Sequence, residues 1–278
     1  MKNTSMRILF IGDIVGKPGR DLIRRGVPLI VSRFGIELVI ANVENAAGGA
    51  GITREVGETI RDYGVDVMTS GNHIWDKKEA IDYIGLEPRL LRPANYPSGV
   101  PGHGRYVART AAGDPVAVIN VMGRVFMLGI DNPFTTVLDE IEAIGEQARL
   151  IVVDVHAEAT SEKLAMGWYL DGRVTAVVGT HTHVQTADQQ ILPGGTAYIT
   201  DVGMTGAHDS IIGVEKAAVL TRFLTSMPSR FEPATGDPRL NAVVVTADAR
   251  SGRATAIERV SLSAREIDAL AANPVSAQ

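Results

Sequence analysis

Two histidines stand one residue apart in the stretch Val177-Val-Gly-Thr-His-Thr-His-Val184. Residues i and i+2 of an extended segment lie on the same face, so His181 and His183 can point toward one spot. Imidazole nitrogens that converge in this way are typical metal ligands. The alternative interpretation is two ordinary hydrogen-bonding side chains at the end of a strand, and the rest of the chain must decide between the two.

Other residues of metal-binding types follow further apolar runs of the chain. In an open α/β sheet, ligands bind outside the carboxyl ends of the strands, so such residues would gather there. Asp13 follows the run RILFIG, and Glu44 with Asn45 follows ELVIANV. Asn72 with His73 follows the run VDVMTSG, and His156 with Glu158 follows RLIVVDV. Together with the two histidines above, they would surround one cleft at one edge of a sheet.

This set of residues is too large to serve a single ion. It also contains carboxylates, which can bridge two ions, so the sequence predicts two metal ions a few ångströms apart. Imidazole ligands favour manganese, iron or zinc over calcium or magnesium. We therefore expect two divalent or mixed-valence ions, with iron and manganese first and zinc as a further candidate.

The composition is that of an ordinary globular protein, with 45% hydrophobic and 21% charged residues in a chain of 278. A formal net charge of -5 gives no basic field for a polyanion, which argues against duplex nucleic acid as a partner. The absence of cysteine removes disulfides, zinc-thiolate sites and thiol nucleophiles. No apolar stretch approaches the roughly 18 residues of a membrane span and no export signal is visible, so we expect a cytoplasmic protein.

Short apolar runs rich in β-branched residues alternate with helical patterns along most of the chain. The runs are continuously apolar, which indicates strands that are covered on both faces. Helical periodicity predicts helices over residues 53–63, where Gly64 is the stop, and over residues 134–147. Alternation of strands and helices predicts an α/β sheet protein.

The C-terminal third has a different pattern. A connection rich in proline and glycine over residues 226–240 precedes two β-rich runs around a Ser-Gly turn, which predicts a hairpin near residues 241–262 added to the sheet. A short helix over residues 264–272 and a frayed tail over residues 273–278 would follow. We find no internal repeat, charge block or linker, so the sequence favours a single domain over residues 1–278.

Three short motifs resemble the D…GNH…H…GHxH pattern of calcineurin-like metallophosphoesterases. They are Gly12-Asp13, the GNH of residues 71–73 and the GTHTH of residues 179–183. Longer stretches resemble the bacterial YmdB-like branch of that superfamily over about residues 6–260, namely FIGDIVGKPGR, NVENAAGG, SGNHIWD, DVHAEATSEKLAMGWYLDGR, VVGTHTHVQTAD and ITDVGMTG. The resemblance implies a layered α/β/β/α sandwich.

The resemblance also implies an activity and a role for each ligand. Members of the branch are described as phosphodiesterases that act on 2',3'-cyclic nucleotides. By position, the first metal ion would be held by Asp13, Glu44, Asn45 and His183, and the second by Glu44, Asn72, His156 and His181. Glu44 would bridge the two ions. A metal-bridging hydroxide would attack phosphorus, and His73 would be the general acid that protonates the leaving oxygen.

The chain departs from the wider superfamily at two places that the branch shares. Val15 stands where the motif D-x-H would have a histidine, and Glu44-Asn45 stands where a bridging aspartate is usual. Both changes make one metal site poorer in nitrogen, which weakens its hold on soft ions.

Several residues near the motifs have simpler interpretations. Glu158 could orient His156 or be a plain polar loop residue, and the glycine-rich residues 46–51 could let the backbone pass close to the cleft. We interpret His103 and His208 as surface histidines, and Trp168 as a core residue on a helix.

Two alternative functions remain for the whole chain. One is an amidohydrolase barrel, but there the H-x-H pair comes on the first strand, whereas here it comes late. The other is a regulatory protein that binds metal and phosphate with little turnover. The substrate expected for the enzyme is a small phosphodiester, and assembly into a homo-oligomer is left open.

Overall fold

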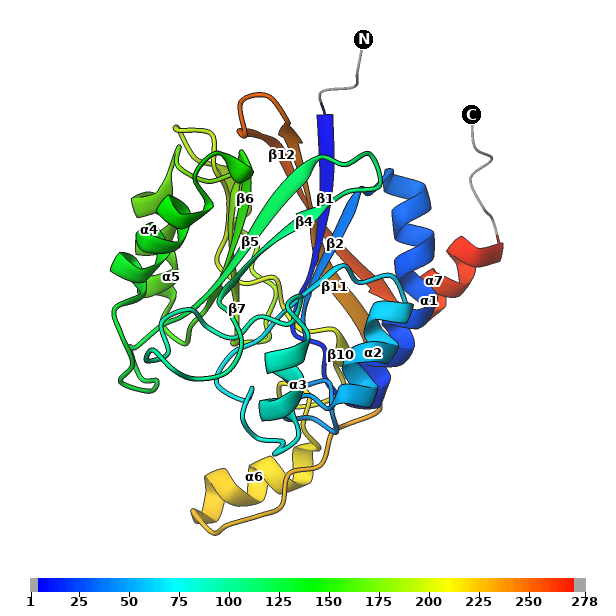
Figure 1. The fold of residues 1–278 in the computed structure, drawn as a ribbon. Helices are drawn as coiled ribbons and strands as arrows, with labels where there is room; N and C mark the ends of the chain where they lie inside the picture. The colour runs from blue at the N-terminus through cyan, green and yellow to red at the C-terminus, as the bar shows by residue number, and fades with distance from the viewer. Residues whose placement is uncertain (1–4, 273–278) are drawn as a thin grey trace.

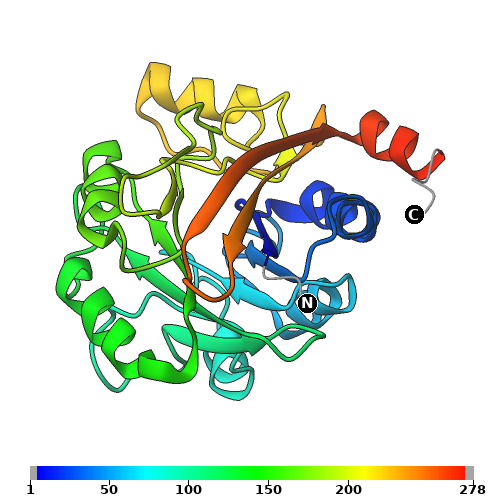
Figure 2. The ribbon, with the colours of Figure 1, turned by 90° about the horizontal axis from the view of Figure 1, so that it is seen from above.

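The computed structural model describes residues 5–272 and shows two sheets stacked face to face, with helices on both outer sides (Figure 1, Figure 2). The first sheet has the strand order β10 (Gly206–Ala207), β11 (Pro238–Asp248), β1 (Ser5–Ile11), β2 (Leu38–Asn42), β3 (Val67–Thr69), and β12 (Ala254–Ser263) pairs with β11. The second has the order β4 (Arg105–Arg109), β5 (Pro115–Met122), β6 (Leu150–His156), β7 (Ala176–Thr180), β9 (Ala197–Ile199), β8 (Gln190–Ile191).

Three apolar clusters hold these layers together. The central cluster lies between the sheets, where Phe10 and Ile40 of the first sheet join Val152 and Val178 of the second. The second cluster packs the first sheet against α1 (Gly16–Phe34), α2 (Arg54–Asp62), α3 (Ala80–Leu86) and α7 (Ala264–Ala272). The third packs the second sheet against α4 (Pro133–Ile144) and α5 (Thr160–Leu170). These layers confirm the α/β/β/α sandwich, whereas α6 (Lys216–Thr225) projects from its lower end in Figure 1.

The predicted helices and hairpin are confirmed. Thr53 caps α2 by accepting a hydrogen bond from the backbone N–H of Val56 at 3.3 Å, and a 3-10 turn over Gly145–Gln147 completes the segment after α4. The hairpin consists of β11 and β12, and β11 joins the sheet antiparallel to β1. The final helix has the predicted bounds, and the predicted tail over residues 273–278 lies outside the described residues.

Two expectations from the sequence are wrong. The predicted ligands do not follow the strands of one sheet, because β1, β2 and β3 belong to the first sheet and β6 and β7 to the second. Trp168 is not a core residue but is 53% exposed, since the neighbouring Gly167 faces the core, where a Cβ would lie 2.5 Å from the Tyr198 ring.

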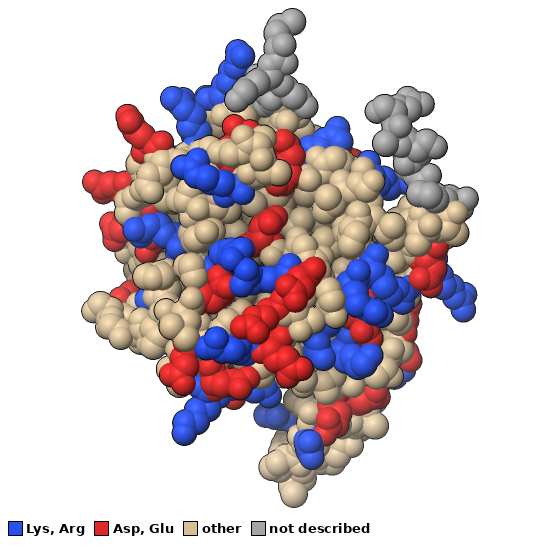
Figure 3. All heavy atoms as spheres, turned by 45° about the vertical axis from the view of Figure 1, so that its right-hand side comes forward, with Lys and Arg blue, Asp and Glu red and all other residues tan. Residues whose placement is uncertain are grey.

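The surface carries both signs of charge. On the face drawn in Figure 3, basic and acidic side chains are intermixed. Over residues 5–272, every helix is too short or too polar to span a membrane.

Candidate metal centre

All the predicted metal ligands meet at the carboxyl ends of strands from both sheets. The first sheet contributes the residues that follow β1, β2 and β3, namely Asp13, Glu44, Asn45 and Asn72. The second contributes the last residue of β6 and the residues after β7, namely His156, His181 and His183. Parallel pairing of β1 with β2 and β3, and of β6 with β7, brings these ends to one side of the molecule.

One group of ligands surrounds the ring of His156, which is fully buried. Its Nε2 lies 3.1 Å from Glu44 Oε2, 3.1 Å from Asn72 Oδ1 and 3.0 Å from Nδ1 of His181. Glu44, His156 and His181 offer ligand atoms that all lie within 4.8 Å of one another. This group is the predicted second metal site.

A second group lies beside it and shares Glu44. Asp13, Glu44 and His183 also offer ligand atoms within 4.8 Å of one another. The amide Nδ2 of Asn45 lies 3.0 Å from Glu44 Oε1 and 3.3 Å from His183 Nε2, and a half-turn of the amide exchanges its nitrogen and oxygen. This group is the predicted first metal site.

Each ligand histidine has its second ring nitrogen held by another group. Nδ1 of His156 lies 2.9 Å from Oγ1 of Thr180, whose hydroxyl donates to Asp154 and can therefore accept from that nitrogen. Nδ1 of His183 donates to the carbonyl of Ile212 at 2.9 Å. These contacts leave Nε2 of both rings for a metal ion.

The sequence suggested that Glu158 could orient His156, but in the structure it does not. Its Oε2 lies 3.2 Å from Nε2 of His181, which leaves Nδ1 of that ring for the centre. The reason is that β6 ends at His156, so residues 156 and 158 do not share the face of a continuing strand. Thr180 and Asp154 hold His156 instead, and nothing in the sequence beyond their polarity pointed to this pair.

The carboxylates and imidazoles of the centre shift one another's pKa values. Burial raises the pKa of Glu44, but the charge and hydrogen bond of His156, together with the charges of His73 and His181, outweigh burial and lower that pKa to about 2. Burial lowers the pKa of His156, but Glu44, Asp13 and Asp154 together outweigh burial and raise that pKa to about 9. Burial, with His156 next, lowers the pKa of His181 to about 3, and burial raises the pKa of Asp13.

The donor atoms fit metal ions better than they fit one another. A single hydrogen on His156 Nε2 cannot serve the three neighbours that converge on it. Asp13 Oδ1 is buried and has no hydrogen-bond partner among the described residues. Buried lone pairs are costly unless a donor or a cation meets them. Two ions, with Glu44 between them, would use these atoms.

The backbone around the centre is built for close approach. A Cβ at Gly71 would lie 2.1 Å from the ring of His156 and 2.3 Å from Oε2 of Glu44, so only glycine fits before the Asn72-His73 pair. His181 and His183 have positive φ angles of 94° and 66°. Positive φ is costly for residues with a side chain and is concentrated at functional sites.

His73 lies beside the centre and outside both ligand groups. Its backbone N–H donates to Oε2 of Glu44 at 3.3 Å, and its side chain is 40% exposed. Nδ1 of the ring lies 2.8 Å from Oδ2 of Asp76. The sequence analysis missed Asp76, although the spacing His73-x-x-Asp76 on a turn could have indicated the pair.

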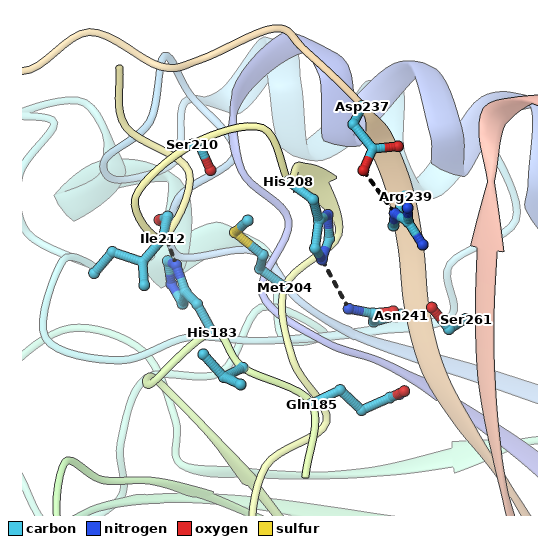
Figure 4. Close-up of a pocket in the computed structure, with 11 residues that line it drawn as sticks. His183, Gln185, Met204, His208, Ser210, Ile212, Asp237, Arg239, Asn241 and Ser261 are labelled. Carbon is cyan, nitrogen blue, oxygen red and sulfur yellow. Dashed lines mark hydrogen bonds and ion pairs between the residues drawn. The ribbon is translucent and has the colours of Figure 1, made fainter. Parts of the chain in front are cut away.

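The centre opens into a cleft of about 290 Å³. His73, His181 and His183 line it, as do Gly48, Gly49 and Ala50, which confirms that the glycine-rich residues 46–51 pass close to the ligands. Across His183 lies a polar cavity of about 530 Å³ (Figure 4).

His208 lines this polar cavity and is not a surface histidine. It is half-buried, and its Nε2 lies 3.1 Å from the amide nitrogen of Asn241 (Figure 4). Nearby, Arg239 donates to Asp237 at 2.9 Å. His103 is exposed, as predicted.

Comparison with known proteins places this site in a family. The family model described as "YmdB-like protein" matches residues 9–260. The chain belongs to the YmdB-like family. A relative from Bacillus subtilis (strain 168), named 2',3'-cyclic-nucleotide 2'-phosphodiesterase, is 50% identical over 255 residues, which cover 92% of this chain and 96% of the relative.

Two solved structures resemble the whole fold. A hypothetical protein from Thermus thermophilus has a TM-score of 0.86 and 44% identity, with 93% of this chain and 99% of that chain covered. A structure described as a novel phosphatase of Mycoplasma pneumoniae has a TM-score of 0.88 and 32% identity, with 96% and 98% covered. The sandwich of this YmdB-like chain is thus shared with a phosphatase.

Proposed function

We propose that this protein is a metal-dependent phosphodiesterase that hydrolyses small phosphodiesters, and 2',3'-cyclic nucleotides in particular. The observation that carries the proposal is the pair of ligand groups that share the buried carboxylate of Glu44. Asp13, Asn45 and His183 would hold one ion with Glu44, and Asn72, His156 and His181 would hold the other. The name of the Bacillus subtilis relative supports the substrate class.

The ligands are imidazole, carboxylate and amide groups, which suit iron, manganese or zinc. Such a pair of ions lowers the pKa of bound water and offsets negative charge on phosphoryl oxygens. In hydrolysis, the oxygen of water joins phosphorus while the bond between phosphorus and a ribose oxygen breaks. That ribose oxygen must then receive a proton.

We propose His73 as the residue that gives this proton. Its ring lines the cleft, and its backbone is held against Glu44, so it lies beside the candidate metal ligands without being part of either ligand group. The contact of Nδ1 with Asp76 directs proton transfer to Nε2.

His73→Ala tests both the reaction and the role of His73. We expect both metal ions to stay bound and hydrolysis of 2',3'-cyclic AMP to fall by about 10²- to 10⁴-fold, the usual contribution of a general acid. The variant should lose far less activity on bis-p-nitrophenyl phosphate, because p-nitrophenolate leaves without a proton. Steady-state kinetics and elemental analysis of the purified variant measure these effects.

His103→Ala, at an exposed histidine away from the centre, is the control and should keep full activity. Equal losses on both substrates, or loss of a metal ion, would assign His73 to binding instead of proton transfer. A wild-type protein that binds two ions but turns over neither diester would favour the regulatory alternative.

A further inference from the structure

The cleft that contains the metal ligands also has an apolar lining. Beside the histidines and Glu44, it is lined by Val15, Ile212, Val214, Phe231 and Pro233. A phosphate group and its metal ions gain nothing from hydrocarbon contacts. Ligand sites combine an apolar wall with a few polar groups when the ligand itself has an apolar part. The cleft is therefore shaped for a phosphodiester that carries a flat or apolar organic group.

Phe231 is the aromatic member of this lining, and its backbone is held in place. The segment that carries it pairs with the loop after Gly213: Glu215 N–H donates to the carbonyl of Glu232 at 3.0 Å, and Ala234 N–H donates to the carbonyl of Gly213 at 2.8 Å. Val214 and Pro233 form a bridge between these bonds. The ring is thus attached to a fixed strand-like pair and not to a free loop.

The ring of Phe231 is exposed and already has one cationic neighbour. Phe231 is 41% exposed, although its side chain is large and apolar. The guanidinium carbon of Arg222, on α6, lies 5.3 Å from the ring centroid. Exposed aromatic rings in binding clefts are the groups on which proteins stack nucleobases, and arginine adds cation–π attraction.

We propose that Phe231 is the stacking platform for the base of a nucleotide substrate. This inference rests on the proposed function, because it concerns the organic part of the same phosphodiester. The phosphodiester would bind at the metal site, and Phe231 would hold the base at the apolar side of the cleft. Phe231 would then set the preference for nucleotides over diesters without a base.

Two cyclic diesters separate base binding from the chemical step. Glycerol 1,2-cyclic phosphate has the same five-membered cyclic phosphodiester as 2',3'-cyclic AMP but no base. For Phe231→Ala we expect kcat/KM for 2',3'-cyclic AMP to fall by about tenfold to a hundredfold, chiefly through KM. This is the usual effect of one lost stacking contact. The value for the glycerol diester should stay within about twofold of wild type. Phe231→Trp should restore the activity on 2',3'-cyclic AMP.

Phe223→Ala is the matched control. Phe223 is 80% exposed on the neighbouring helix α6, and it does not line the cleft. This variant removes the same ring from the same surface region and should leave kcat/KM unchanged for both diesters. Metal content is measured for every variant, so that a lost ion is not mistaken for lost stacking.

A binding measurement gives a second readout that does not depend on turnover. Adenosine has the base but no phosphate, and its resonances should broaden in NMR spectra when wild-type protein or Phe231→Trp is added. Phe231→Ala should abolish this broadening. If wild-type protein hydrolysed neither diester, the proposed function would fail, and the adenosine measurement alone would decide the role of Phe231.

Two results would overturn the role of Phe231. One is an equal loss on both cyclic diesters, which would show that the ring supports the cleft and not the base. The other is a fall in kcat/KM for 2',3'-cyclic AMP, but not for the glycerol diester, that occurs in His208→Ala and does not occur in Phe231→Ala. That outcome would place the base in the polar cavity across His183 (Figure 4).

Discussion

Glu44 is the residue on which the two ligand groups depend. Oε1 lies beside Asn45 in one group, and Oε2 lies beside His156 in the other. The side chain is only 1% exposed, so its charge must be compensated by its neighbours. A carboxylate with two differently placed oxygens can bridge two dications, whereas a neutral amide of the same shape is a poor bridge.

Glu44→Gln is therefore expected to abolish tight binding of one of the two ions. Hydrolysis should fall with it, because the remaining ion lacks its partner. Elemental analysis after dialysis gives the number of ions per chain. Glu146→Gln is the control, since Glu146 is an exposed glutamate of the 3-10 turn after α4. Two ions per chain in Glu44→Gln would contradict the bridging assignment.

The sequence predicted the residues that meet at the centre but not the residues that orient them. Ligand types at the ends of apolar runs were visible because each motif is local, as in GNH or GTHTH. Asp154, Asp76 and Phe231 were not visible, because their roles depend on which distant residue the fold brings opposite each of them. The misassignment of Glu158 has the same origin: proximity in sequence was taken for proximity at the site.

At the scale of elements, the turn after β7 shows how the fold holds two strained ligands. Thr182, between the two histidines of positive φ, donates through its backbone N–H and its hydroxyl to Asp201 Oδ2 at 3.1 and 2.6 Å. Lys163 of α5 donates to the same oxygen at 2.7 Å. Lys163 and Asp201 are both fully buried. The buried pair thus anchors the turn to the helix behind it.

Lys163→Met should lower the free energy of unfolding by about 3–5 kcal/mol, because it leaves the Asp201 carboxylate buried without its partner. Lys163→Met combined with Asp201→Asn should recover part of that loss, since no unpaired charge remains. Urea unfolding of the proteins, after a chelator has removed their metal ions, measures both effects. In the exposed pair Lys216–Asp209, Lys216→Met should change stability by less than about 1 kcal/mol. Similar losses at both lysines would contradict this account.

The strands themselves could be predicted from the sequence, but their division into two sheets could not. Continuous apolar runs such as that of β6 identify a strand buried on both faces, and β6 is buried along its whole length. Which neighbour a strand pairs with is decided by contacts far apart in sequence. Reasoning from residues alone therefore placed every ligand at one sheet edge, and only the resemblance to a family implied the sandwich.

At the scale of the molecule, the metal centre lies where the two sheets meet. Asp13, Glu44 and Asn72 come from the first sheet, and the three ligand histidines come from the second. Ions bound there would tie the sheets together at their carboxyl ends. Metal binding and folding are therefore expected to be coupled, and removal of the ions should lower the melting temperature.

The same centre predicts how metal binding depends on pH. Without metal, the pKa of His156 is about 9, so the ring is protonated at pH 7, whereas the pKa of His181 is about 3 and that ring is already neutral. A metal ion needs neutral imidazole, so binding must displace one proton from His156. The apparent affinity should then rise about tenfold for each pH unit between pH 7 and about 9, and level off above that.

Competition with a chelator across this pH range measures the slope, and calorimetry in two buffers of different ionisation enthalpy counts the proton. A histidine with an ordinary pKa near 6.5 would instead give an affinity that is flat above about pH 7. The contrast arises because Glu44 lies 3.1 Å from His156 and stabilises its proton until the ion replaces it. A flat profile above pH 7 would show that this ion pair does not form in the metal-free protein.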